Sequence, residues 1–384
     1  MASLTGELDR SEPTLSEKLR GLSWVLILSI CEAACFGLAA LYSAANGSME
    51  PWAARQLMRF AVALVLMIAI ALLAIRHWYR LAYWAYALAL VLVIAVDLRG
   101  IIGMGARRWI DLGIIQLQPS ALMSVALVLA LARYFHALAN EDVGRLRLLI
   151  LPALMVLVPA ALVLKQPDLG SAIMLILTGA ALFFIAGVRL RFFLLAAAAI
   201  TAAVPAGWHF LRDYQRKRIY TLLDPESDPL GAGYHILQSK IALGSGGLFG
   251  KGFLNGTQSH LSFLPEKHTD FIFTTLAEEF GLVGGLTLLA LYTLIIVCGF
   301  TIALQCRNHF GRLLGLGIVT HFSLYVFINI AMVMGLIPVV GVPLPLISYG
   351  GTAMLAVMFG FGLLLNVGVH RNTQINRSGE TSRG

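Results

Sequence analysis

Charged residues are scarce in this 384-residue sequence, at 12% against 59% for hydrophobic residues. Soluble domains carry about 25% charged residues, so a conventional water-soluble fold is excluded and an integral membrane protein is predicted. The net charge of +8 is then a property of the loops. No segment resembles a nucleic-acid-binding module, and no nucleic-acid partner is expected.

Cysteine is scarce as well. The four cysteines, Cys31, Cys35, Cys298 and Cys306, lie in or beside apolar segments, and only the first two are as close as i, i+4. This pattern is neither a metal-binding spacing nor a disulfide framework, and it favours a packing role for all four.

Long apolar runs, by contrast, are plentiful. Inside a bilayer every backbone polar group needs an internal partner, so runs of spanning length form helices. The predicted fold is all-α, a polytopic membrane protein with about ten transmembrane helices. The predicted spans are 22–44, 53–75, 80–98, 119–137, 147–164, 170–187, 190–211, 271–304, 311–335 and 347–369.

The distribution of Lys and Arg predicts the orientation of these spans. More than half of the 28 basic residues fall on the side of the N-terminus, in the tails and in the loops after even-numbered spans. Basic loops stay on the cytoplasmic side, so both termini are predicted to be cytoplasmic. The tails 1–21 and 370–384 then flank a membrane domain, 22–369, and the first apolar run is too long to be a cleavable signal.

The opposite side also holds positive charge, against the usual bias. A long extracytoplasmic loop, 212–269, between the seventh and eighth spans carries seven basic residues. Long loops escape the charge rule, so simple solvated charge explains these seven. Arg107 and Arg108 lie in a short loop, 103–120, where an anionic ligand is the simpler explanation. Paired Arg side chains can fork onto phosphate oxygens.

Two further outer segments combine polar residues with helix breakers. KQPDLGS, 165–171, joins two spans with almost no loop, and its Lys165 and Asp168 either pair with each other or line a cavity. PVVGVPLPLISYGG, 338–351, has no charge and takes its side-chain polarity from Ser348 and Tyr349. Such proline-glycine segments are typical of re-entrant or broken helices that line cavities.

Within the long loop, QSKIALGSGGLFGKGFL, 238–254, is too apolar for a free loop and too rich in glycine for a span. We expect a partly helical, amphipathic element that lies in the outer interface.

The stretch SHLSFLPEKHTDFIFTTLAEEFG, 259–281, changes abruptly from a polar run to an apolar helix pattern. Ionisable groups at a membrane boundary lose hydration and are rare unless they are used. One interpretation makes Thr269 a helix cap with Asp270 in the first turn, where the helix dipole favours a carboxylate. The other makes Asp270 a functional acid, and the local sequence leaves both open.

Eight segments together resemble one known family. They are GARRWIDLG, QPS, KQPDLGS, YQRKRI, DPLGAGYHILQSKIALGSGGLFGKG, GTQSHLSFLPEKHTDFIFTTLAEEFG, NIAMVMGLIP and VVGVPLPLISYGG, and they run from Gly105 to Gly351. The chain is identified as a member of the SEDS family (shape, elongation, division and sporulation). FLPEKHTDFIFT, with Lys267, is closer to its rod-shape branch, RodA, than to its division branch, FtsW.

The resemblance implies a peptidoglycan glycosyltransferase of the bacterial inner (cytoplasmic) membrane that polymerises lipid II at the outer face during cell elongation. It implies a class B penicillin-binding protein and the elongation machinery as partners, a divalent cation such as Mg²⁺ or Mn²⁺, and no organic cofactor. The family's essential aspartate corresponds to Asp270. Its cavity residues correspond to Arg107, Arg108, Lys165, Gln166, Asp168, His268, Ser348, Tyr349, Gly350 and Gly351.

One departure from the family pattern is visible. The family usually has Glu directly after QPS and Lys three residues later, where this chain has Ala121 and Ser124. A Glu–Lys pair is therefore missing from the outer end of the fourth span, while the net charge of the cavity is unchanged.

The chemistry follows from the residue types. Glycan polymerisation needs a base for the attacking hydroxyl and positive charge for the pyrophosphate leaving group. Asp270 is the candidate base, and Arg107, Arg108, Lys165 and Lys267 are the candidates for the pyrophosphate. The roles of Glu32 and Asp97, two further acids in or near spans, stay open, while at least one of Glu278 and Glu279 must face protein.

Two other function classes suit a polytopic protein with a lipid substrate. A lipid II flippase needs polar groups along the whole path across the membrane, whereas here they cluster on the outer side. A secondary transporter often shows internal repeats, and the two halves of this sequence do not match. The glycosyltransferase is therefore the favoured prediction, with the flippase as the alternative.

Overall fold

The computed structural model describes residues 14–103, 106–111, 113, 116–139, 141–210, 213–224, 231–257 and 266–375, without the side chains of Arg99, Arg107 and a few others. Helices make up most of it. The first half contains α1 (Leu15–Arg20), α2 (Trp24–Ala44), α3 (Ala53–Leu72), α4 (Ile75–Arg99), α5 (Pro119–Ala137), the 3-10 turn η1 (Asp142–Gly144) and α6 (Leu146–Lys165). The second half contains α7 (Leu169–Ile185), α8 (Leu190–Phe210), α9 (Asp213–Leu223), α10 (Ala232–Ser245), α12 (Ile272–Gln305), α13 (His309–Val333) and α14 (Gly351–Val369).

Membrane-spanning length is confirmed for most of the predicted spans. Among the described residues eight helices are long and apolar enough to cross a bilayer, and α7 and the apolar part of α8 are shorter. All ten predicted segments are helical, and the protein is a polytopic, all-α membrane protein. A Cβ on Gly21, directly after α1, would lie 3.7 Å from Cα of Val369, the last residue of α14, so both lie at the same end of the bundle, as an even number of crossings requires.

The bundle packs closely through small residues, which let helix backbones approach in a membrane. A Cβ on Gly362 of α14 would lie 2.9 Å from the Met67 carbonyl oxygen of α3. A Cβ on Gly37 of α2 would lie 2.7 Å from Cα of Ile347. Through this contact between Gly37 and Ile347, the segment before α14, residues 335–350, packs against the bundle.

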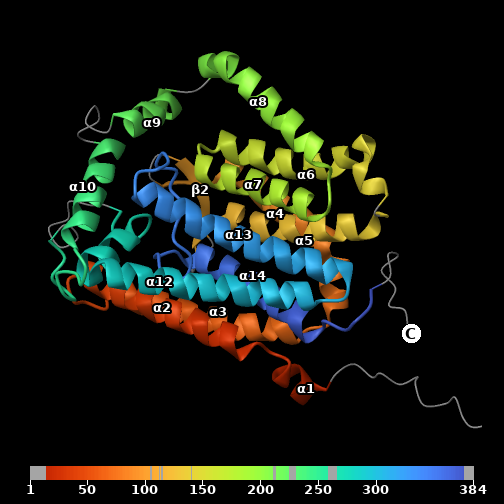
Figure 1. Cartoon of the computed structure of the whole chain (residues 1–384), viewed down its shortest axis with the longest axis horizontal. Helices are drawn as coiled ribbons and strands as arrows, with labels where there is room; N and C mark the ends of the chain where they lie inside the picture. Colours follow the sequence, from red (N-terminus) through yellow and green to blue (C-terminus); the bar gives the residue numbers. More distant parts are fainter. Residues whose placement is uncertain are drawn as a thin grey trace, which may run out of the picture.

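In its described parts, the long loop predicted between the seventh and eighth spans contains the helices α9 and α10. Figure 1 shows α8 leaning away from the bundle, and α9 and α10 forming an arc that returns to the start of α12. The segment 238–254 is partly helical as expected, because α10 takes up its first part. It packs against α12, where Ser239 Oγ lies 3.0 Å from Thr274 Oγ1.

A small antiparallel sheet forms where only a loop was predicted. Strands β1 (Ile101–Gly103), β2 (Ala106–Asp111) and β3 (Gln116–Leu117) pair in sequence order at the end of the bundle that carries Asp270. β-branched and aromatic residues between glycines suit short strands, but the spans on either side dominate the sequence pattern there. Arg107 and Arg108 are both in β2.

Candidate functional site

Asp270 lies in a turn ahead of α12, and its side chain is half-buried. The turn is closed by the amides of Thr269 and Phe271, which both donate to the Glu266 carbonyl at 3.2 Å. Phe271 is the N-cap, and the Thr269 hydroxyl donates to the Glu266 carboxylate at 2.6 Å. The prediction that Thr269 caps the helix with Asp270 in its first turn is therefore wrong.

Three successive carbonyl groups of this turn accept hydrogen bonds from other parts of the chain. The His268 carbonyl accepts from the Tyr349 amide at 2.8 Å, and the Thr269 carbonyl accepts from the Ser348 hydroxyl at 2.6 Å. The Asp270 carbonyl accepts from the Asn329 side chain of α13 at 2.8 Å. The structure thus brings Ser348 and Tyr349 to the turn that carries Asp270.

Residues 335–350, which we call the PVVG loop, are themselves anchored from three helices. The Tyr292 hydroxyl of α12 donates to the Pro345 carbonyl at 2.6 Å. The Gln56 side chain of α3 donates to the Ser348 carbonyl at 3.0 Å, and Asn329 donates to the Val342 carbonyl at 2.7 Å. A segment without regular structure is thereby held in one conformation beside Asp270.

The PVVG loop also brings the KQPDLGS segment to the same place. A Cβ on Gly170, in the first turn of α7, would lie 2.5 Å from the Val340 carbonyl oxygen. The next residue, Gly341, has φ +71°, and a Cβ there would lie 3.4 Å from Asp270 Oδ2. Two of the predicted polar segments therefore meet across Val340 and Gly341.

Asp168 and Arg108 form a charged pair beside the site. Asp168 is buried, caps α7, and accepts the Ser171 hydroxyl at 2.8 Å. Arg108 donates to the Pro167 carbonyl at 2.8 Å, and its Nε lies 3.9 Å from Asp168 Oδ2. This pairing replaces the Lys165–Asp168 pair that one interpretation of the sequence expected.

Lys165 and Gln166 turn toward α4. Lys165 Nζ lies 3.3 Å from Asp97 Oδ2, which also gives Asp97 a partner, and the Lys165 side chain is largely exposed. The buried Gln166 donates to the Val93 carbonyl at 2.8 Å. Both anchor the start of the KQPDLGS segment. The side chain of Arg107 lies outside the described part of the chain.

An aromatic stack covers the other face of the turn. The rings of Trp52 and His268 are parallel, 4.4 Å between centroids and 8° between planes. The Tyr349 ring lies 6.0 Å beyond His268, and the Arg59 guanidinium sits 4.9 Å from the Tyr349 centroid. Gly351, at the start of α14, packs against the same guanidinium, which a Cβ there would approach to 3.0 Å.

Burial changes the protonation of two residues in the turn. It lowers the pKa of the Lys267 ammonium, which is almost completely enclosed. Burial is also the main cause that lowers the pKa of His268; Glu266 opposes the shift, and Lys267 adds to it. A neutral imidazole next to Asp270 is the result near neutral pH.

Helix α12 is broken two turns after the site, at Gly281, which has φ 64° and ψ −160°. The glycine-rich segment 246–252 fills the break, and we call this arrangement the clasp. Lys251 and Gly252 amides donate to the Glu278 and Glu279 carbonyls, at 3.1 and 3.0 Å. In return, the Leu282 and Val283 amides donate to the Gly247 and Leu248 carbonyls, at 2.9 and 3.1 Å. Backbone groups freed by the break are thus satisfied inside the protein.

Both acids beside the break are buried. Glu278 accepts from Lys251 Nζ at 2.7 Å and from the Thr257 hydroxyl at 3.0 Å. Glu279 accepts from the Ser43 hydroxyl of α2. The sequence-based expectation that at least one acid faces protein is met by both. Glu32, by contrast, is exposed on α2.

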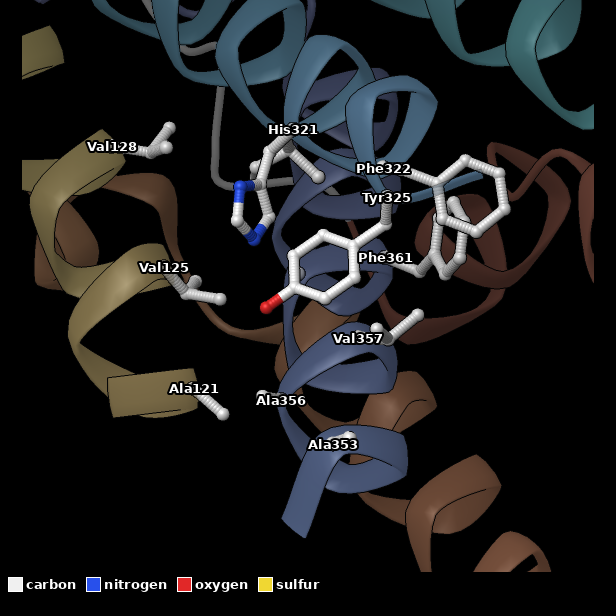
Figure 2. Close-up of a pocket in the computed structure, with 12 residues that line it drawn as sticks. Ala121, Val125, Val128, His321, Phe322, Tyr325, Ala353, Ala356, Val357 and Phe361 are labelled. Atoms are coloured by element: carbon white, nitrogen blue, oxygen red, sulfur yellow. The ribbon is translucent and has the colours of Figure 1, made fainter. Parts of the chain in front are cut away.

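A narrow cavity of about 30 Å³ lies between α5, α13 and α14, room for about two water molecules. Figure 2 shows the rings of His321 and Tyr325 pointing from α13 toward Val125 and Ala121 on α5, while Val357 and Phe361 line the α14 side. His321 Nδ1 lies 2.7 Å from the Thr178 hydroxyl of α7, and Tyr325 hydrogen-bonds Ser124. Ala121 thus lines a cavity whose other walls are mostly apolar, while Ser124 lies beside it as the partner of Tyr325.

No group of three or more His, Cys, Asp or Glu side chains is arranged to hold a metal ion in the ranges that the structure describes. Mg²⁺, however, is often bound by one or two carboxylates together with substrate phosphates. The half-buried Asp270 suits that shared mode of binding, and a protein-only metal cage does not fit the described residues.

The sequence of this chain is similar to known proteins over almost its whole length. The model of a family described as cell cycle proteins, FtsW/RodA/SpoVE, matches residues 23–373. The chain belongs to the FtsW/RodA/SpoVE family. The family resemblance predicted from the eight motifs is confirmed.

Members of the FtsW/RodA/SpoVE family with names and structures are similar along most of their length. Peptidoglycan glycosyltransferase MrdB of Escherichia coli is 47% identical over 328 residues, which cover 85% of this chain and 86% of MrdB. RodA of Thermus thermophilus is 30% identical, with a TM-score of 0.69 over 91% of this chain and 98% of that chain. A chain of a peptidoglycan synthase complex that coordinates polymerization and crosslinking is 33% identical, with a TM-score of 0.80 and the same coverage.

Some residues of this family member's site escaped the sequence analysis. Gln56 and Arg59 come from α3, Trp52 directly precedes that helix, and Asn329 lies near the end of the apolar helix α13. The useful signal was a polar or aromatic residue at the Asp270 end of a span, where side-chain polarity is costly unless satisfied. For Asn329 the signal was a single amide inside the motif NIAMVMGLIP.

Proposed function

We propose that the chain is a peptidoglycan glycosyltransferase that polymerises lipid II into glycan strands during cell elongation, with release of undecaprenyl pyrophosphate. The observation that carries the proposal is the convergence on Asp270. The turn before α12, the PVVG loop and α13 all hold the backbone around this half-buried carboxylate. The glycosyltransferase names of relatives such as MrdB support the same activity.

In the proposed reaction, Asp270 accepts the proton of the attacking sugar hydroxyl. The hydroxyl oxygen forms the new bond to the anomeric carbon of the donor, and the bond from that carbon to the diphosphate oxygen breaks. The diphosphate leaves with the bonding electrons. A positioned base of this kind contributes about 10²–10⁴-fold in rate.

The leaving diphosphate needs positive charge near the site. Arg108 is held on the Asp168 side by the Pro167 carbonyl, and Lys267 is within the Asp270 turn. Arg107, Lys165 and His268, with Ser348, Tyr349, Gly350, Gly351 and Gln166, complete the proposed substrate-binding set. A divalent cation shared between Asp270 and the diphosphate would add charge neutralisation.

The proposed orientation places the Asp270 end outside the cytoplasmic membrane and both termini inside. Ser48 lies exposed near the Asp270 end and Glu141 lies exposed in the loop before η1. In a background without the native cysteines, a membrane-impermeant thiol reagent should label Ser48→Cys in intact cells. It should label Glu141→Cys only after permeabilisation; the reverse pattern would overturn the orientation.

A class B penicillin-binding protein is the proposed partner, together with the elongation machinery. The support is that a similar chain belongs to a peptidoglycan synthase complex that coordinates polymerization and crosslinking. Cross-linking of the new strand requires a transpeptidase close to the polymerase.

Purified protein with its penicillin-binding partner and labelled lipid II tests the activity. Glycan polymer that forms in the presence of a penicillin supports the proposal, because the drug blocks cross-linking alone. If no polymer forms with Mg²⁺ and none forms with Mn²⁺, the proposal is contradicted. Translocation of lipid II across vesicles without polymer would instead support the flippase alternative.

A further inference from the structure

Asn329 is a buried amide near the C-terminal end of α13, with no exposed surface. Its side-chain nitrogen donates two hydrogen bonds, one to the Asp270 carbonyl at 2.8 Å and one to the Val342 carbonyl at 2.7 Å. These two carbonyls are separated by the whole of α12 and α13 in the sequence. A single NH₂ group therefore ties the Asp270 turn to the PVVG loop.

The orientation of this amide is determined by its partners. Both neighbours are carbonyl oxygens, which only accept hydrogen bonds, so the NH₂ group and not the amide oxygen must face them. Side chains without donors would leave two carbonyls without this hydrogen bond, which is costly in a protein interior. Asp would place a carboxylate oxygen against both.

Asp270 needs such an anchor because it precedes the helix. Its peptide is outside the regular hydrogen bonds of α12, whose N-cap is Phe271. The Val342 side of the bridge matters as well. Val342 follows Gly341, the glycine whose missing Cβ leaves space beside the Asp270 carboxylate. Asn329 thus contacts the backbone of Asp270 directly and the wall facing its carboxylate through Val342.

We propose that Asn329 is a positioning residue for the glycosyl transfer, one that holds the Asp270 carboxylate where the attacking hydroxyl meets it. The inference rests on the proposed role of Asp270 as base. Misplacing a catalytic group by about 1 Å costs on the order of 10²-fold in rate. Removal of the bridge lowers turnover through Asp270, while donor binding by the arginines continues.

The chain offers a matched control at the far end of α14. Asn366 is buried too, and its side-chain nitrogen donates to the carbonyls of Ile70, Ala71 and Leu73 at the end of α3. Asn329→Leu and Asn366→Leu therefore remove the same kind of interaction, one beside Asp270 and one remote from it.

The test measures melting temperature and lipid II polymerisation for both variants, in complex with the penicillin-binding partner. Both should melt at lower temperature. Asn329→Leu should lower kcat about 10²-fold with KM within about threefold, whereas Asn366→Leu should keep the kcat of the unmodified protein. Equal kcat values for the two variants, at temperatures matched below each melting point, would overturn the proposal.

Two further variants keep the outcome interpretable. In the Asp270→Asn background, Asn329→Leu should cause no further loss of turnover, because residues that act as a unit are not additive. If Asn329→Leu does not fold, Asn329→Ser retains one donor and should lose less turnover. If Asp270→Asn is inactive and Asn329→Leu is fully active, only the positioning role of Asn329 is refuted. If Asp270→Asn is active, the proposed role of Asp270 as base is refuted.

Discussion

Lys251 and Glu278 form an ion pair at the break in α12, with the ammonium nitrogen 2.7 Å from the carboxylate oxygen. The carboxylate is fully buried and the ammonium is partly exposed. The pair joins the clasp to the half-helix Ile272–Phe280, and Asp270 lies just before that half-helix. The clasp therefore stabilises the segment on which the site is built.

Removing one partner of this pair should destabilise the protein. Lys251→Met leaves a buried carboxylate with the Thr257 hydroxyl as a remaining partner, and breaking a buried pair costs about 3–5 kcal/mol. The partial exposure of Lys251 favours the lower end of that range. Thermal unfolding in detergent measures the loss. The double variant Lys251→Met, Glu278→Gln should recover part of it, and a double variant less stable than Lys251→Met contradicts the pairing.

Gly281→Ala should destabilise the clasp far more than an ordinary glycine replacement. The φ and ψ of Gly281 are nearly exclusive to glycine, and a Cβ would lie 2.3 Å from the Gly250 amide nitrogen. Gly187→Ala is the control, because Gly187 also has positive φ, +91°, but has open space around its Cβ position. Gly187→Ala should cost about 1–2 kcal/mol of backbone strain. Similar melting temperatures for both variants would show that the close packing of the clasp contributes little.

Asp270→Asn should abolish polymerisation while the protein stays folded. The substitution keeps the size of the side chain and removes proton acceptance, so turnover should fall about 10²–10⁴-fold. Its melting temperature should change little, because Asp270 precedes the N-cap and Asn keeps the size of the side chain. Glu50→Gln, an exposed acid near the same end, should keep full turnover. Near-normal polymer from Asp270→Asn rules out the general-base role.

Acidification should weaken the fold through His268. Burial lowers the pKa of this imidazole in the folded protein, whereas an unfolded histidine titrates near pH ~6.5. Below that value the unfolded chain binds the proton more readily, so stability falls as the pH drops from about 6.5 toward the folded pKa. His268→Gln should flatten the dependence of melting temperature on pH between about 7.5 and 5. His77→Gln, an exposed histidine, should retain the slope, and an unchanged slope in His268→Gln would refute the role of His268.

Restoring the family's usual pair should show strong coupling. Ala121→Glu alone places a carboxylate without a cationic partner in the buried cavity of Figure 2 and should destabilise the protein by about 3–5 kcal/mol. Adding Ser124→Lys, one turn along α5, supplies a partner and should return a large part of that loss. A thermodynamic cycle over the four proteins measures the coupling, and additive effects would mean that the two side chains do not meet.

The sequence by itself determined the membrane fold and pointed to one candidate location for the chemistry. Apolar runs of spanning length have one solution in a bilayer, the helix, so the ten segments were predictable from composition along the chain. The polar interruptions at KQPDLGS, PVVGVPLPLISYGG and the Asp270 run were visible for the same reason, since unsatisfied polarity is costly there. Motif resemblance then pointed to Asp270 and to the family.

Only the tertiary structure decided how these segments meet. The helix start at Ile272, the short sheet at 101–117 and the pairing of Lys165 with Asp97 depend on neighbours that are distant in sequence. The same holds for the contacts of Trp52 with His268 and of Asn329 with Asp270. Local sequence determines hydropathy and helix length, whereas the rotation of each helix and its side-chain partners are set by packing against the other helices.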